Sequence, residues 1–216
     1  MSLVQELPKH GRFIRGLAFS PDGRLLAVGA EDEAGMVKIW DPKTGQLFRD
    51  LRGHAGAVIA LAFSPDGSIL ASACMDDNVR LWDAATGRLL DGFREKVVAR
   101  DGLAFRPDGR LVMASMEGTV NVHDVSTRQT ISSFQGNIQW VLPAAFSSDA
   151  RLVALGSEDG AIKVWETDSG KEVHSLEAHS GLVSDLIFLD GDRRLVTCGE
   201  DRTLKIWDME IGRAHV

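Results

Sequence analysis

The feature that most constrains this chain is a repeat of about 42 residues that runs through nearly its whole length. One marker of the repeat is a tryptophan, or a histidine in its place, found at Trp40, Trp82, His123, Trp165 and Trp207. A second marker is a phenylalanine, found at Phe19, Phe63, Phe105, Phe146 and Phe188. Two independent markers that share one period indicate that each repeat is a single supersecondary unit.

Each repeat has the same interior, which the second repeat shows most clearly. The run VIALAF (58–63) ends in the marker phenylalanine and is followed by the turn SPDG, in which proline and Asp-Gly favour a chain reversal. SILASAC (68–74), an acidic turn and VRLW (79–82) come next, and a fourth short run closes the unit. VRLW alternates apolar and polar residues, as a strand with two different faces does. No segment sustains a helical period, so the unit is predicted to be a four-stranded antiparallel meander.

The period also selects the architecture. Many short strands with regular turn signals indicate an all-β sandwich, barrel or propeller. Of these, only the propeller repeats every four strands, because each repeat forms one radial blade. The sequence therefore predicts a single all-β domain over residues 1–216, with five four-stranded blades. The repeats cover approximately residues 10–51, 54–93, 96–134, 137–176 and 179–216.

Two repeats carry a signature that resembles the WD-repeat (WD40) family of β-propellers, in which a G-H pair is followed by W-D. In repeat two the matching residues are Gly53-His54, Ser72, Asp76 and Trp82-Asp83. In repeat five they are Ala178-His179, Thr197, Asp201 and Trp207-Asp208. The resemblance implies a buried hydrogen-bond chain within each blade, a structural clamp. One clamp would join His54, Ser72, Asp76 and Trp82, and the other would join His179, Thr197, Asp201 and Trp207.

A serine, a histidine and an aspartate also suggest nucleophilic catalysis. The set recurs with a tryptophan in step, however, and a clamp is needed once per blade whereas a catalytic centre is needed once per protein. Buried polar groups of these kinds are costly unless they pair, and together they can satisfy one another. The sequence therefore favours the structural interpretation, and no catalytic residue is assigned.

The other repeats depart from the signature. Repeat one has His10 and Trp40, but Val28 occupies the hydroxyl position. Repeat three has Met113 at the hydroxyl position and His123 at the tryptophan position, and repeat four has Leu155 at the hydroxyl position. We expect these blades to depend more on apolar packing than on polar chains.

The ends of the array suggest how it closes. The segment LVQEL (3–7) precedes His10 as a fourth strand precedes each later repeat, so it could complete the last blade and close a five-bladed ring. Closure of this kind removes exposed sheet edges. The alternatives are an arc of a larger propeller and self-association with a second copy.

Composition narrows the class of partner. The net charge is -7, which disfavours nucleic acid because such binders place Lys and Arg against phosphates. No secretory signal or apolar run of about 20 residues is visible, so no membrane association is expected. Cys74 and Cys198 have no metal-binding spacing and fit a reducing, cytoplasmic location. Neither a metal nor a cofactor is expected.

Candidate partner-binding residues are those that the repeats do not share. Three large apolar residues each lie three positions after the place of the signature histidine in their repeat. They are Trp140, Phe13 and Leu182. Large aromatic residues on an exposed face are typical of binding hot spots. The leading hypothesis is a non-catalytic scaffold that presents one propeller face to a protein or peptide. The alternatives are an enzyme with a site at the channel mouth and a purely structural part of a larger WD protein.

Overall fold

The computed structural model describes residues 6–8, 10, 12–31, 35–96, 98–136 and 141–210, without the side chain of Leu142. In this part of the chain every regular element is a strand and none is a helix, which confirms the prediction of an all-β fold. No helix in it is therefore long and apolar enough to cross a membrane. The chain divides into two compact units, residues 1–98 and 99–216, and each is described by itself.

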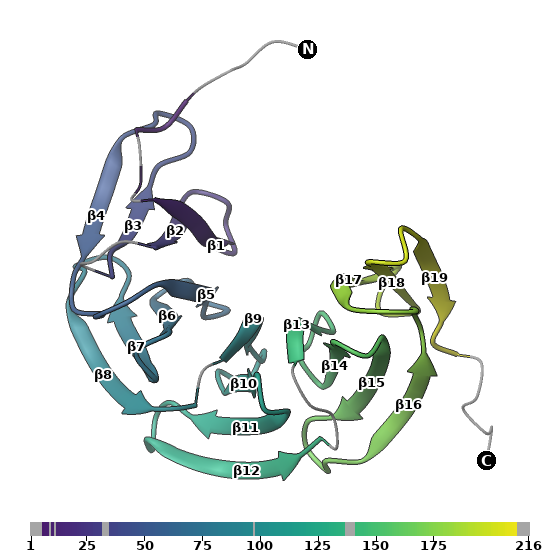
Figure 1. Ribbon diagram of the computed structural model, residues 1–216. Helices are drawn as coiled ribbons and strands as arrows, with labels where there is room; N and C mark the ends of the chain where they lie inside the picture. The colour runs from purple at the N-terminus through teal and green to yellow at the C-terminus, as the bar shows by residue number, and fades with distance from the viewer. Residues whose placement is uncertain are drawn as a thin grey trace. The chain divides into compact units, whose positions relative to one another are not determined.

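The first unit contains two antiparallel sheets, each with its four strands in sequence order (Figure 1). We call them blade one and blade two. Blade one comprises β1 (Phe13–Phe19), β2 (Leu26–Glu31), β3 (Val37–Trp40) and β4 (Leu47–Leu51). Blade two comprises β5 (Val58–Phe63), β6 (Ile69–Cys74), β7 (Asn78–Asp83) and β8 (Leu89–Arg94).

The second unit contains three further meanders (Figure 1). Blade three comprises β9 (Val98–Phe105), β10 (Leu111–Ser115), β11 (Thr119–Asp124) and β12 (Gln129–Gln135). Blade four comprises β13 (Val141–Phe146), β14 (Leu152–Ser157), β15 (Ala161–Glu166) and β16 (Glu172–Glu177). Blade five comprises β17 (Val183–Leu189), β18 (Arg194–Gly199) and β19 (Leu204–Asp208).

Two details of the second unit differ from five separate four-stranded blades. Blades three and four form one eight-stranded sheet, because the first strands β9 and β13 pair in parallel at Arg100 and Pro143. Blade five has three strands among the described residues. The proposed closing strand 3–7 lies mostly outside the described residues, so closure of the ring stays a prediction.

The turn between the first two strands of a blade is held by its own side chains. In blade two, Ser64 Oγ donates to Asp66 Oδ1 at 2.5 Å and accepts the Ile69 N–H at 2.9 Å. Gly67 has φ of 72°, a conformation that glycine adopts without strain. The hydrogen bond from Ser64 is the main cause that lowers the pKa of Asp66 to about 2. The SPDG sequence thus fixes the reversal that places β5 and β6 in register.

The apolar core lies between consecutive blades of a unit. In the first unit, Val37 and Ile39 of blade one share a buried cluster with Val58, Leu61 and Phe63 of blade two. The second unit has corresponding clusters between blades three and four and between blades four and five. Each blade therefore depends on its neighbour for burial, as expected for a repeat architecture.

Candidate functional site

The four signature residues of blade two lie together, with His54 in the loop before β5, Ser72 in β6, Asp76 in the turn after β6 and Trp82 in β7. His54 Nε2 lies 2.7 Å from Ser72 Oγ, and Trp82 Nε1 donates to the same oxygen at 2.8 Å. On the other side of the imidazole ring, His54 Nδ1 lies 3.3 Å from Asp76 Oδ1. Asp76 also accepts the N–H of Ala55 at 2.9 Å. These contacts join the loop before β5, the second strand, the acidic turn and the third strand of one blade.

Arg80 adds a charge to this group that the signature does not include. Its guanidinium contacts His54 Nδ1 and lies 3.1 Å from Asp76 Oδ2. Burial of the imidazole, with the charge of Arg80 second, lowers the pKa of His54 to about 4. Burial opposes ionisation of Asp76, but hydrogen bonds, first from the Ala55 N–H and also from Arg80, outweigh burial, and the pKa of Asp76 lies well below its ordinary value. His54 is therefore neutral near pH 7, and Asp76 is charged.

Blade five contains the same arrangement without an arginine. His179 Nδ1 lies 2.9 Å from Asp201 Oδ1, and its Nε2 lies 2.8 Å from Thr197 Oγ1. Trp207 Nε1 donates to Thr197 Oγ1 at 3.0 Å. The threonine hydroxyl thus contacts the imidazole at Nε2, and its oxygen accepts the indole N–H.

This geometry leaves the two histidines nothing to offer a substrate. Both imidazoles are buried, with side-chain exposures of 0%, and both ring nitrogens of each have partners. A general base must reach the proton that it removes. His54, Cys74 and Asp76 do bring three potential metal ligands within 4.8 Å of one another. The Arg80 cation lies against two of them, and burial raises the pKa of the Cys74 thiol to about 11, so the group is poorly suited to hold a metal.

Blade one shows the effect of a missing hydroxyl. Val28 occupies the register position of Ser72 and is buried. The rings of His10 and Trp40 lie 5.1 Å apart. His10 Nε2 and Trp40 Nε1 are both buried and have no hydrogen-bond partner among the described residues. At the same position, blades three and four have the buried apolar residues Met113 and Leu155.

The three predicted partner-binding residues have different surroundings. Phe13, at the start of β1, is 59% exposed, and the Arg15 guanidinium lies 5.3 Å from the centre of its ring. Leu182, just before β17, is half-buried. Trp140 lies outside the described residues. Phe13 and Leu182 belong to different units, so the structure does not place them on a common surface.

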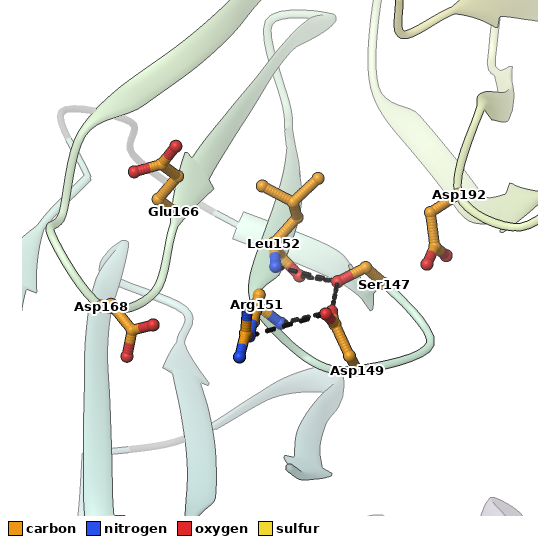
Figure 2. Close-up of a pocket in the computed structure, with 7 residues that line it drawn as sticks. All are labelled: Ser147, Asp149, Arg151, Leu152, Glu166, Asp168 and Asp192. Atoms are coloured by element: carbon orange, nitrogen blue, oxygen red, sulfur yellow. Dashed lines mark hydrogen bonds and ion pairs between the residues drawn. The ribbon is translucent and has the colours of Figure 1, made fainter. Parts of the chain in front are cut away.

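A polar hollow of about 440 Å³ lies in the second unit, at the turns of blades four and five (Figure 2). Its lining residues are Ser147, Asp149, Arg151, Leu152, Glu166, Asp168 and Asp192. Figure 2 shows Ser147 bonded to Asp149 and Leu152, in the same pattern as Ser64 in blade two. Burial opposes ionisation of Asp149, but hydrogen bonds from Arg151 N–H and Ser147 Oγ outweigh it and lower its pKa.

The other carboxylates of the hollow are also held by neighbouring groups. The buried guanidinium of Arg106, in blade three, binds Asp168 of blade four through two nitrogens. This ion pair is the main cause that lowers the pKa of Asp168. Asp192 accepts the Ser148 hydroxyl at 2.6 Å, and Glu166 accepts the Ser169 hydroxyl at 2.8 Å. The side chains around the hollow therefore join neighbouring blades through hydrogen bonds and an ion pair.

Sequence reasoning missed these links between blades. Arg106 replaces the serine of the SPDG turns, and this departure from the repeat was the available signal. Its partner, Asp168, lies 62 residues further along the chain, a separation at which no local pattern indicates pairing.

A comparison with known families gives a match over most of the chain. The family model described as IFT122 first beta-propeller matches residues 13–213. The matched range includes residues from all five repeats and confirms the resemblance to WD-type propellers.

Proposed function

The chain belongs to the IFT122 first beta-propeller family, and we propose that it is a non-catalytic scaffold that presents one propeller face to a protein or peptide partner. Propeller membership supports interaction as the general role. The proposal goes further in assigning the contact to side chains that the repeats do not share. A cytoplasmic location is part of the same proposal.

The observation that carries the proposal is the exposure of Phe13. A phenylalanine at the start of a blade's first strand could pack against neighbouring side chains, but this ring is 59% exposed. Arg15 lies over the ring, and Arg15 in turn binds Glu31 at 2.6 Å. An aromatic ring with an arginine over one side, itself fixed by an ion pair, offers apolar area at low entropic cost. We propose Phe13 as a contact residue, with Trp140 and Leu182 as further contacts.

The enzymatic alternative finds less support. Its obvious candidates, His54 and His179, are buried and occupied by their own blades. The carboxylates of the hollow are held by Ser147, Arg106 and Ser148. A scaffold therefore accounts better for how the described polar groups are used.

A site-specific photocrosslinking experiment tests the scaffold proposal. A benzophenone amino acid is introduced at position 13, at position 140 and, as a matched control, at position 48. Phe48 is also exposed and also lies under an arginine, Arg49, but it lies on the outer strand β4. We expect the same discrete adducts from positions 13 and 140 in a cell extract, and none of them from position 48. Identical adduct patterns at all three positions would contradict a dedicated face.

A further inference from the structure

One face of blade five carries exposed apolar residues, and Asp185, which pairs with Cys198, lies on the same face. Leu186 and Phe188 of β17 belong to the cluster shared with blade four, so the alternate residue Ile187 points to the opposite face. On that face Ile187 pairs with Val196, Val196 pairs with Ile206, and Cys198 pairs with Leu204. Ile187, Leu204 and Ile206 are 57%, 66% and 61% exposed. We call these five apolar residues the outward face of blade five.

The corresponding residues of other blades are covered by the next blade. Val37 and Ile39 of β3 are fully buried in the cluster that includes the first strand of blade two. Ile162 and Val164 of β15 are fully buried in the cluster that includes the first strand of blade five. A face of this type is therefore normally an acceptor for the first strand of a following blade.

In these two junctions the acceptor face has small residues at three positions. Blade one has Ala18, Ala27 and Gly29 there, and blade four has Ala145, Ala154 and Gly156. The space is needed: a Cβ on Gly29 would lie 2.8 Å from Val58 Cγ1, and one on Gly156 would lie 2.7 Å from Val183 Cγ1 and 3.0 Å from Leu186 Cδ2. Blade five has Ile187, Val196 and Cys198 at the same positions, each larger than its counterpart.

The junction between blades three and four shows how a larger acceptor is accommodated. Val112 of β10 replaces the alanine found in blades one and four, and the following strand β13 has Ala144 where β5 has Leu61 and β17 has Leu186. Val112 and Ala144 lie in one buried cluster. The volume added on one side is thus removed on the other, as close packing requires.

We propose that the outward face of blade five accepts a further WD-type repeat, stacked as the next blade, with a residue of alanine size at the position of Leu61. The face continues the series of junctions seen within each unit, and its larger residues specify a smaller first strand. The chain's own β1 fits poorly, because it has Ile14 and Leu17 at the positions of Val58 and Leu61. A second copy of the chain would bring the same β1. The outward face does not include Phe13, and its role does not depend on the scaffold proposal.

The test adds a blade and reads the result at a native thiol. A copy of residues 127–166, which includes Ala144, is placed after Glu210 in place of residues 211–216. A matched protein carries Ala144→Leu in the copy alone. Cys198 is a free, half-buried thiol on the outward face, and its labelling rate with a maleimide reports whether that face is covered. Cys74 is free and buried in blade two, so its slow labelling reports that the first unit is folded.

We expect the added blade to slow labelling of Cys198 by at least about tenfold relative to the 216-residue chain, and the Ala144→Leu version to protect it much less. Equal or better protection by the leucine version would overturn the size argument. Absence of protection by either version, with Cys74 still slow, would overturn the blade as occupant. If Cys198 were already protected from labelling in the 216-residue chain, the proposal would also be overturned. If Leu17→Ala abolished that protection, β1 would be the occupant, and if the protection rose with protein concentration, a second copy would be.

Discussion

At the scale of single residues, the hydroxyl position of each blade decides how its histidine and tryptophan are used. Ser72 and Thr197 each contact an imidazole nitrogen and an indole N–H, so one small side chain satisfies two buried groups. Val28 cannot do so, and His10 Nε2 and Trp40 Nε1 lack hydrogen bonds among the described residues. A buried donor or acceptor without a partner costs about 1–3 kcal/mol. Blade one therefore has an unused opportunity for stabilisation.

Val28→Thr should recover part of this cost. Threonine keeps the branched shape of valine and places a hydroxyl where Thr197 has one in blade five. We expect a gain on the order of 1 kcal/mol in the free energy of unfolding, measured by urea denaturation. The matched change Ser72→Ala in blade two should lower it by about 1–3 kcal/mol. A loss on Val28→Thr would show that the new hydroxyl is buried without partners.

His54 should make stability depend on pH. In the folded protein its pKa is lowered to about 4, mainly by burial and secondly by Arg80, whereas the ordinary value is 6.5. The unfolded chain therefore binds the proton more readily, and the stabilisation is complete above about pH 6.5 and is lost as the pH falls toward 4.

The measurement is urea denaturation of wild type and His54→Gln across this range. The wild-type free energy of unfolding should fall by up to roughly 3 kcal/mol more than that of His54→Gln between pH 6.5 and 4. Comparing the two proteins removes the contribution of His10, whose pKa burial also lowers. Parallel pH profiles would show that His54 is not held neutral.

At the scale of strands and blades, a leucine at one position of the repeat contributes differently to stability in different blades. Leu61 of β5 is 8% exposed in the junction of blades one and two, whereas Leu17, at the same position of β1, is 59% exposed. Leu61→Ala should lower the free energy of unfolding by about 2–5 kcal/mol, because it opens a cavity in a packed junction. Leu17→Ala should change it by less than about 0.5 kcal/mol. Thermal and urea unfolding of the two variants would check this, and equal losses would indicate that β1 is covered in solution.

The sequence predicted the strands better than their surroundings. The alternation in VRLW predicts a third strand with two faces, and β7 contains it. The corresponding segments IKVW and LKIW lie in β15 and β19. Alternation shows which residues share a face but not what covers that face, so Ile39 and Ile206 look alike in sequence and differ in burial. The Arg106–Asp168 ion pair could not be predicted from the sequence for a related reason, because it depends on how two blades stack. The hydrogen-bond geometry around His54 was implied by a family resemblance, whereas the contact with Arg80 was not.

At the scale of the whole molecule, the sequence and the structure divide the chain differently. The 42-residue period continues past residue 98 without a change in spacing, so the sequence predicts one domain. The structure separates residues 1–98 from residues 99–216 as compact units. Compact units can still unfold together, because the stability of a repeat array depends on the interfaces between neighbouring repeats.

We predict a single unfolding transition for the whole chain. Each unit has its own reporters, Trp40 and Trp82 in the first and Trp140, Trp165 and Trp207 in the second. Replacing the tryptophans of one unit at a time with phenylalanine leaves fluorescence from the other unit. Both proteins should show one urea transition once the effect of the substitutions on stability is measured by circular dichroism.

Ser72→Ala and Thr197→Ala test the same point from the other side. In a single cooperative domain, weakening blade two must shift the transition reported by the second unit, and weakening blade five must shift the one reported by the first. If each substitution moved only the transition of its own unit, the two units would be independent domains and the 42-residue period would mark a common repeat without a common folding unit.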